Sequence, residues 1–409
     1  MIYQADYIVT LNGDPIKNGA IRILNNRIEE VGTREQVQPE NGEFVRVLPE
    51  TILMPGLLNS HCHLELGHVR GLLPEKESYS MWVARLQHFL ASTETKGYEE
   101  NIRLGALECL HFGTTTVVDI GNTLQNFKML PKSPIRSYSV YEALGLHPEK
   151  GLDYFKKYWK LSQQKLRAKI LPERCMFSVG AHAPYSCSPE LLNFVVSESK
   201  KLETPFVIHG AEGLEEQELF AEEKGRLYEF CKRRYPKVPY EKGKESLEYL
   251  LANNWLPNGS IVAHGNTIKR EVAVELAKRS ISLVHCPRSR EFFGHPEFPF
   301  EMCYNAGVNI CLGTDSLASN DNYNLFDEMA EFRRIYPQIE CEKILELVTL
   351  NGAKAVGRER ELGRIAEGYL ADIIGIRLHH NEGTDIYDEI VCEDHDVEFV
   401  LVDGEEVII

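Results

Sequence analysis

The middle of this chain alternates short apolar runs with amphipathic helical sequence, and this alternation restricts the fold more than any other feature. Near-continuous apolar runs of roughly four to eight residues are typical of parallel strands that are covered on both faces. Between two of them, Ser188 is predicted to cap a helix that has Pro189 at its first position. Eight runs predict strands at 52–59, 114–120, 136–144, 175–182, 204–209, 260–265, 281–286 and 308–314. Eight β-then-α units predict a parallel (β/α)₈ barrel, whose chemistry belongs at the C-terminal strand ends.

The two ends of the chain have a different character from the middle. Both alternate apolar and polar positions between Gly, Asn and Asp turns, which is typical of half-buried strands. Asn25 and Asn26 separate two such runs and predict a hairpin. We therefore expect an α/β protein with two domains, a small β-sandwich of residues 1–52 plus 365–409 and a barrel of residues 53–364.

Charge and hydropathy exclude several classes of partner. The 409 residues carry a formal net charge of −16, which disfavours binding to a phosphate backbone, so no nucleic acid is expected. No apolar run approaches the roughly 20 residues needed to span a bilayer, and the first residues do not form a signal peptide. Ten scattered cysteines are expected to be reduced and mostly buried, so we expect a cytoplasmic protein with no membrane partner.

Metal-ligating residue types stand where several predicted strands end. His61 and His63 are one residue apart, so their side chains point to the same face of a strand. This pair alone fits a structural role as well as a metal site. His209, His264 and Asp315 follow three other strands, and nitrogen ligands with one carboxylate suit Zn²⁺ or Fe²⁺. Together these strand ends predict one divalent metal, with Zn²⁺ preferred.

The motifs that contain these residues resemble those of the amidohydrolase superfamily. Within it the chain is similar to the cytosine-deaminase-like aminohydrolases, which include S-adenosylhomocysteine, methylthioadenosine, guanine and aminodeoxyfutalosine deaminases. The resemblance covers nearly the whole chain and implies a distorted (β/α)₈ TIM barrel with a terminal β-sandwich. It rests on Pro-Gly-Leu-Leu-Asn-Ser-His-Cys-His at 55–63, His-Gly-Ala-Glu at 209–212, Ala-His-Gly-Asn at 263–266, His-Cys-Pro-Arg-Ser at 285–289 and Leu-Gly-Thr-Asp-Ser at 312–316.

The resemblance also implies roles for these residues. His61, His63, His209 and Asp315 would hold one metal, because the fourth strand lacks the lysine that bridges two ions in other members. The metal would lower the pKa of a bound water to about 7. Asp315 would take a proton from that water, Glu212 would protonate a ring nitrogen, and His264 would hydrogen-bond the attacking oxygen.

The residues that would bind the substrate are less constrained. His182 matches a histidine that helps to hold adenosine-type substrates, and Trp82 is placed at the mouth, although a core position is the alternative. The glutamate that grips the ribose in such deaminases is missing near residues 88–92, and the Tyr141–Glu142 region replaces an expected arginine. Glu65 and Arg288, or Arg290, are assigned to the substrate instead. Alternatively Glu65 orients a ligand histidine and Arg288 ties loops together.

These observations predict a metal-dependent aminohydrolase that acts on a small molecule and releases ammonia. An adenosine-type compound such as aminodeoxyfutalosine, which carries a benzoate, is the expected substrate. A chlorohydrolase or a cyclic amidohydrolase on the same scaffold is the alternative, and a non-catalytic metal-containing binding protein is the alternative of another class. The family resemblance also implies a possible homodimer. The charged segment 212–248 is expected to form solvated helix or a lid over the site.

Overall fold

The computed structural model describes residues 1–409 except 168–170, 238–239, 241, 380–384, 393–394 and 409. It contains an eight-stranded parallel sheet in the order β12-β11-β10-β9-β8-β7-β6-β5. A parallel bridge between Cys62 and Asp315 joins its two edges, so the sheet closes into a barrel. The strands are β5 (Leu57–Cys62), β6 (Thr114–Gly121), β7 (Arg136–Ala143), β8 (Cys175–Ala181), β9 (Val207–Gly210), β10 (Ile261–His264), β11 (Ser282–His285) and β12 (Asn309–Leu312).

Helices surround this barrel, and the predicted cap at Ser188 is confirmed because its side chain accepts a hydrogen bond from the Leu191 amide. The α-helices are α1 (Tyr79–Ala91), α2 (Thr95–His111), α3 (Asn126–Met129), α4 (Pro148–Arg167), α5 (Pro189–Leu202), α6 (Leu214–Glu222), α7 (Gly225–Arg234), α8 (Ser246–Ala252), α9 (Arg270–Lys278), α10 (Pro287–Phe293), α11 (Phe300–Asn305), α12 (Leu325–Ile335), α13 (Cys341–Leu347), α14 (Leu350–Ala355) and α15 (Ile386–Cys392). Two 3₁₀ helices, η1 (Leu64–Val69) and η2 (Leu130–Lys132), complete the set. No described helix combines the length and the apolar character needed to cross a bilayer.

The two ends of the chain meet in a second sheet, as expected. Where a sandwich was predicted, their strands are hydrogen-bonded into one seven-stranded sheet in the order β15-β14-β13-β4-β1-β2-β3. Asn25 and Asn26 form the predicted hairpin, with Leu24 paired to Arg27. The strands are β1 (Ile2–Ile8), β2 (Ile16–Leu24), β3 (Arg27–Thr33), β4 (Val45–Pro55), β13 (Ile373–Arg377), β14 (Val397–Val402) and β15 (Glu405–Glu406).

The predicted strand at 52–59 is wrong in its bounds, because two strands share that apolar run. β4 ends at Pro55 in the terminal sheet, and β5 begins at Leu57 in the barrel. Gly56 lies between them, and a Cβ at this position would come within 2.2 Å of the Thr115 hydroxyl. The strand that carries His61 is therefore a direct continuation of a strand of the other sheet. The division into two domains stays a proposal.

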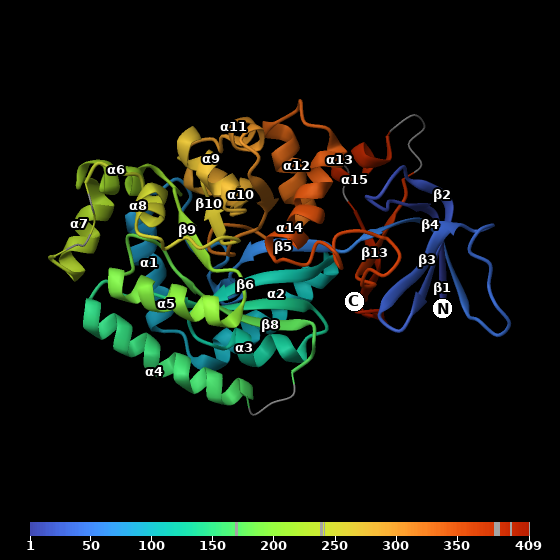
Figure 1. Cartoon of the computed structure of the whole chain (residues 1–409), viewed down its shortest axis with the longest axis horizontal. Coiled ribbons are helices and arrows are strands. Elements are labelled where there is room, and N and C mark those ends of the chain that lie inside the picture. Colours follow the sequence, from blue (N-terminus) through green and yellow to red (C-terminus); the bar gives the residue numbers. More distant parts are fainter. Residues whose placement is uncertain (168–170, 238–239, 241, 380–384, 393–394, 409) are drawn as a thin grey trace.

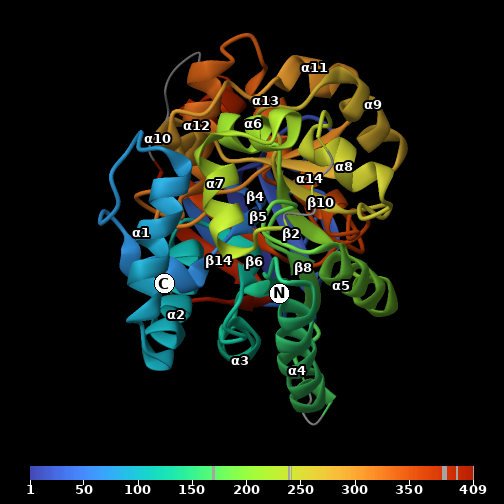
Figure 2. The ribbon, with the colours of Figure 1, turned by 90° about the vertical axis from the view of Figure 1, so that its left-hand side faces the viewer.

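The barrel strands point their C-terminal ends away from the terminal sheet. In Figure 1, α1, α6 and α7 lie at the end of the molecule opposite the seven-stranded sheet. Figure 2 turns that end toward the viewer and shows these helices across the mouth of the barrel. The strand-end residues thus lie beneath a helical cover.

Candidate active site

Three histidines and an aspartate converge where β5, β9 and β12 end. His63 Nε2 lies 3.2 Å from His209 Nε2, and Asp315 Oδ1 lies 3.7 Å from His61 Nε2 and 3.8 Å from His63 Nε2. Ligand atoms held at about 2.1 Å around one ion are separated by roughly 3.0–3.5 Å in tetrahedral geometry. The spacing of this donor set is therefore close to that of a divalent metal site.

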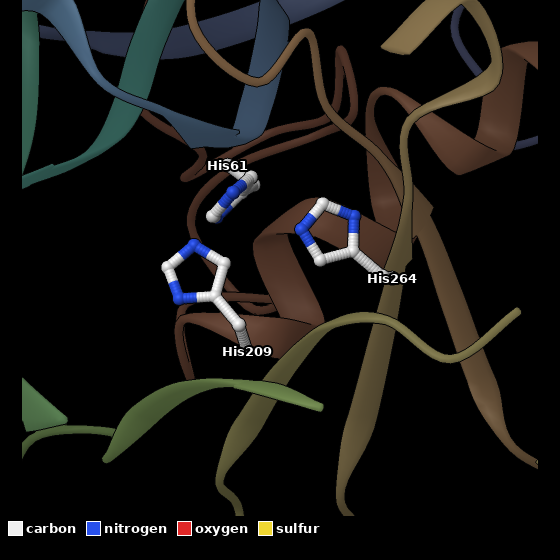
Figure 3. A group of neighbouring side chains, drawn as sticks. All are labelled: His61, His209 and His264. Carbon is white, nitrogen blue, oxygen red and sulfur yellow. The ribbon is translucent and has the colours of Figure 1, made fainter. Parts of the chain in front are cut away.

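His61 gives an independent reason to place an ion here. It is fully buried, and neither of its ring nitrogens has a hydrogen-bond partner within the described part of the chain. A buried polar group without a partner is costly, so a ligand is expected to satisfy it. Figure 3 shows the rings of His61, His209 and His264 turned toward one another. His264 belongs to a second such group with His61 and His209, so geometry alone also allows it as a ligand.

Contacts around these groups prepare them for metal binding. His209 Nδ1 lies 2.6 Å from the His182 carbonyl oxygen, which makes Nδ1 the donor and leaves Nε2 free. Burial lowers the pKa of His61, His63 and His209, so their rings are neutral near pH 7, the form that binds metal. Burial raises the pKa of Asp315, but its close approach to the His61 ring outweighs burial and holds the pKa well below the ordinary value, so the carboxylate is ionised.

The Asp315 carboxylate is fixed by three further hydrogen bonds. The hydroxyls of Ser289 and Ser319 donate to Oδ2 at 2.7 and 3.1 Å, and the Ser316 amide donates to Oδ1 at 2.7 Å. The backbone of Asp315 has φ 58°, an uncommon conformation for a residue with a side chain. The turn after β12 thus orients one carboxylate oxygen toward the histidines.

Glu212 and His264 form a second pair beside the metal-ligating group. Glu212 Oε1 lies 3.8 Å from His264 Nε2 and 3.8 Å from His295 Nε2. Burial raises the pKa of Glu212, but the charges of His264 and His295 outweigh it and lower the pKa to about 2. Both residues follow sharp turns, since Ala211 has φ 53° and His264 itself has φ 77°. The pair can accept and deliver protons at one end of the site.

A cavity of about 460 Å³ opens outward from these residues. Its lining includes the candidate proton-transfer and metal-ligating groups, together with residues of α1 and α7, the helices that lie across the mouth of the barrel. Glu65, Trp82 and His182 line it, and their assignment to the substrate stays a prediction. Trp82 also packs edge-on against Phe293, with ring centroids 4.8 Å apart. The lid expected from segment 212–248 thus corresponds in part to α7.

Comparison with known proteins identifies the family. The sequence pattern of the amidohydrolase family matches residues 52–407. The chain belongs to this family. Over 97% of its length it is 30% identical to the 5-methylthioadenosine/S-adenosylhomocysteine deaminase of Thermococcus sibiricus, of which it covers 92%. Membership makes the protein a hydrolase that acts on carbon–nitrogen bonds, rather than a non-catalytic binding protein.

Solved structures share the fold of this amidohydrolase. Helicobacter pylori aminofutalosine deaminase, in complex with methylthio-coformycin, superposes with a TM-score of 0.87 at 21% identity, and the match covers 100% of both chains. The zinc-containing adenosine deaminase of Xanthomonas campestris has a TM-score of 0.84 at 20% identity over 99% of this chain and 92% of its own. Both matches support the barrel with its terminal sheet.

Glu65 of the amidohydrolase holds a loop rather than a ligand histidine. Its Oε1 accepts a hydrogen bond from the Asn122 amide at 3.0 Å, and its Oε2 accepts one from the Thr123 hydroxyl at 2.5 Å. Burial raises the pKa of this carboxyl. Glu65 thus fixes the loop after β6 at the edge of the cavity.

Arg288 lies away from the cavity, contrary to the prediction that it faces a substrate carboxylate. Its guanidinium donates to Asn322 Oδ1 at 2.7 Å and lies 3.4 Å from both Asp321 Oδ2 and Asp327 Oδ2. These acidic groups are its nearest counter-charges, so the arginine ties loops together, which was the alternative. Arg290 likewise bonds to the His295 carbonyl and to Glu291 outside the cavity.

Several residues of the site were not assigned from the sequence. Glu142 is the last but one residue of β7 and lines the cavity, as does Arg234 at the end of α7. His295 contacts Glu212, and the hydroxyls of Tyr79 and Tyr185 lie 2.9 Å apart in the cavity wall. Glu142 stands at a strand end and so carried a usable signal. Arg234 and His295 lie on a helix and a loop whose positions the sequence pattern does not define.

Proposed function

We propose that this amidohydrolase is a mononuclear zinc-dependent deaminase that converts an amino-substituted heterocycle of the adenosine type to its oxo form and releases ammonia. The observation that carries the proposal is Glu212, whose carboxylate stands beside His264 at the inner end of the cavity. Zinc is preferred because the donors are nitrogen with one carboxylate. A zinc-containing adenosine deaminase of the same fold supports this choice.

His61, His63, His209 and Asp315 would hold the metal, and His264 would remain free to contact the reacting oxygen. When bound, the metal makes water acidic enough to attack at neutral pH, with a pKa near about 7. The neutral histidines and the ionised Asp315 described above suit this role. Because His209 Nδ1 is engaged by the His182 carbonyl, only Nε2 of that ring is available.

Proton transfer is assigned to three side chains. Asp315 accepts a proton from the attacking water as the new carbon–oxygen bond forms. Glu212 is ionised near pH 7, because His264 and His295 hold its pKa low. It can therefore take up a proton and pass it to the ring nitrogen beside the attacked carbon. His264 stabilises the developing charge on the oxygen. The proton accepted by Asp315 then passes to the amino group, the carbon–nitrogen bond breaks and the amine leaves as ammonia.

The outer cavity suggests the shape of the substrate. His182 and Trp82 would contact the heterocycle and its substituent. At the mouth the Arg234 guanidinium stacks 3.5 Å from the Phe230 ring centroid and donates to Gln87 Oε1 at 2.6 Å. Its hydrogen bonds go to the Phe230 carbonyl and to Gln87 rather than to any described carboxylate, so its charge is available to a substrate anion. An adenosine frame with a benzoate tail, as in aminodeoxyfutalosine, fits an aromatic mouth with this cation.

An ammonia-release screen of zinc-loaded protein tests the proposal. The panel contains adenosine, its 5′-substituted derivatives, aminodeoxyfutalosine, guanine and cytosine. We expect ammonia from the adenosine-type compounds, with the highest kcat/KM for aminodeoxyfutalosine. Removal of metal by a chelator should abolish release, and one equivalent of Zn²⁺ per chain should restore it. Chloride from a chlorotriazine or ring opening of a cyclic amide, without ammonia from any amine, would contradict the proposal and favour the alternative reactions.

A further inference from the structure

Glu142 is a buried carboxyl group that no described residue satisfies. Its side chain is 6% exposed at the end of β7, and its Oε1 has no hydrogen-bond partner within the described part of the chain. His209 Nδ1 lies 3.7 Å from Oε1, too far for a hydrogen bond, and already contacts the His182 carbonyl. Buried carboxyl oxygens are almost always hydrogen-bonded, so this one is expected to meet a donor on a ligand.

The position of Glu142 shows which part of a ligand it can reach. It lines the same cavity as Glu212 and His264, and the residues that follow it, Leu144 and Leu146, line the outer part. Glu142 is thus placed between the reacting end and the apolar mouth. If the heterocycle of a substrate occupies the inner end of the cavity, the substituent attached to the heterocycle lies beside Glu142.

No other acidic residue of the cavity is available for that group. The described acidic residues that line the cavity are Glu65, Glu142, Glu212 and Asp315. Glu65 is engaged by Asn122 and Thr123, and the last two belong to the reacting end. Helix α1 contributes Gln87, Tyr79 and apolar side chains but no carboxylate to the lining. Glu142 is therefore the one carboxyl group of the described cavity lining that is left for this part of a ligand.

The chemistry of the Glu142 carboxyl group favours hydroxyl donors of a ligand over a second metal ion. Burial raises the pKa of Glu142 to about 8, so this group needs hydrogen-bond donors from a ligand to be ionised near pH 7. As a carboxylate it offers two acceptor oxygens and no donor, which matches two neighbouring hydroxyls of a sugar. Glu142, His182 and His209 do lie close enough to share an ion. However, His182 Nδ1 contacts the Ser186 hydroxyl at 2.8 Å and His209 Nδ1 contacts a carbonyl, so these nitrogens are not free ligands.

We propose that Glu142 accepts hydrogen bonds from the vicinal 2′ and 3′ hydroxyls of a ribosyl group and so makes the site selective for ribonucleosides. The proposal rests on the proposed function, because it places the heterocycle of an adenosine-type substrate at the inner end. It adds the recognition group for the sugar, which Glu142 supplies from β7.

Binding of the deaminated products tests this assignment independently of turnover. Calorimetry would compare inosine with 2′,3′-dideoxyinosine on zinc-loaded wild type, Glu142→Gln and the control Glu198→Gln. Glu198 is a matched buried acid on α5, bonded to Trp159 and outside the cavity lining. We expect wild type to bind inosine about 10- to 100-fold more tightly than the dideoxy compound, since hydrogen bonds to a charged group have this effect. Glu142→Gln should reduce the ratio of the inosine affinity to the dideoxyinosine affinity at least about threefold, through weaker binding of inosine alone. Glu198→Gln should keep the wild-type ratio.

The outcomes separate the two proposals. An unchanged ratio in Glu142→Gln, or an equal loss for both nucleosides, would overturn the role of Glu142 and leave the deaminase proposal intact. If wild type bound neither nucleoside, the proposed function and the assignment that rests on it would both fall. Metal content and melting temperature of each variant show whether it is folded, and Glu142→Asp, which keeps the charge, should recover part of the ratio.

Discussion

At the scale of single residues, Glu212 gives the sharpest test of the proton transfer. Glu212→Gln keeps the shape of the side chain but cannot carry a proton to the ring nitrogen. We expect kcat for ammonia release to fall by about 10²- to 10⁴-fold, the usual contribution of a positioned acid–base group. Metal content should stay at the wild-type value, because Glu212 is not among the proposed ligands.

Glu222→Gln is the control for this substitution. Glu222 lies on α6 of the same segment and pairs with Lys224, and both side chains are more than half exposed. Its kcat should equal that of wild type. A Glu212→Gln protein that binds metal and releases ammonia at full rate would remove Glu212 from the mechanism.

Residue positions at strand ends could be predicted from the sequence, and side-chain partners could not. His61, His209 and Asp315 are brought together because the C-terminal ends of parallel barrel strands share one face. Arg288 also stands near a strand end, but its long side chain turns to Asp321 and Asp327. No periodicity encodes the position of that acidic loop, so the partner of Arg288 became visible only in the structure.

At the scale of elements, the number and order of barrel strands followed from apolar patterning, whereas one boundary did not. Residues 51–62 are all buried, so β4 and β5 form one apolar run without a change in period. The break at Gly56 depends on the close approach of Thr115, which is a tertiary contact. The predicted β-rich ends were right, but which strands pair across them, such as β4 with β13, was not encoded in local pattern.

Helix α12 carries a buried acid that should make stability depend on pH. Burial raises the pKa of Glu328 to about 8, although Arg288 and Asn320 donate hydrogen bonds to it. The folded protein therefore holds this proton more tightly than the unfolded chain. The stability that protonated Glu328 gives to the folded state is fully present below the unfolded pKa of about 4.3. It is lost as pH rises through the folded pKa of about 8.

Urea unfolding of wild type and Glu328→Gln at pH 6 and pH 9 measures this effect. Wild type should lose more stability between the two pH values than the variant, because the amide cannot ionise. Glu331→Gln, on the same helix but in a surface pair with Arg334, should retain the wild-type difference. Equal losses in wild type and Glu328→Gln would show that Glu328 does not control this dependence.

At the scale of the whole molecule, a buried ion pair joins the barrel to the terminal sheet. Arg136 begins β7, and its guanidinium donates to Asp372 at 2.7 and 2.9 Å and to Asp403 at 3.1 Å. The side chains of Arg136 and Asp372 are only 2% and 4% exposed. Removing one partner of a buried pair leaves an uncompensated charge and is strongly destabilising.

Arg136→Met should therefore lower the free energy of unfolding by about 3–5 kcal/mol, measured by urea denaturation. Arg103→Ala is the control, because its pair with Glu100 is exposed and should contribute less than about 1 kcal/mol. A similar small loss in both variants would mean that the two sheets are held together by apolar packing alone.

The direct passage of β4 through Gly56 into β5 has a consequence for the order in which the protein can fold during synthesis. The strand that bears His61 is made among the first 62 residues, together with β1 to β4. On one side β5 pairs with β6, but its other side and the strand that it continues are completed late: the Asp315 bridge closes the barrel against β5, and β13 pairs with β4. The ribosome must therefore release most of the chain before the histidine strand is fixed on both sides, so the proposed metal site is among the last parts of the nascent protein to be completed.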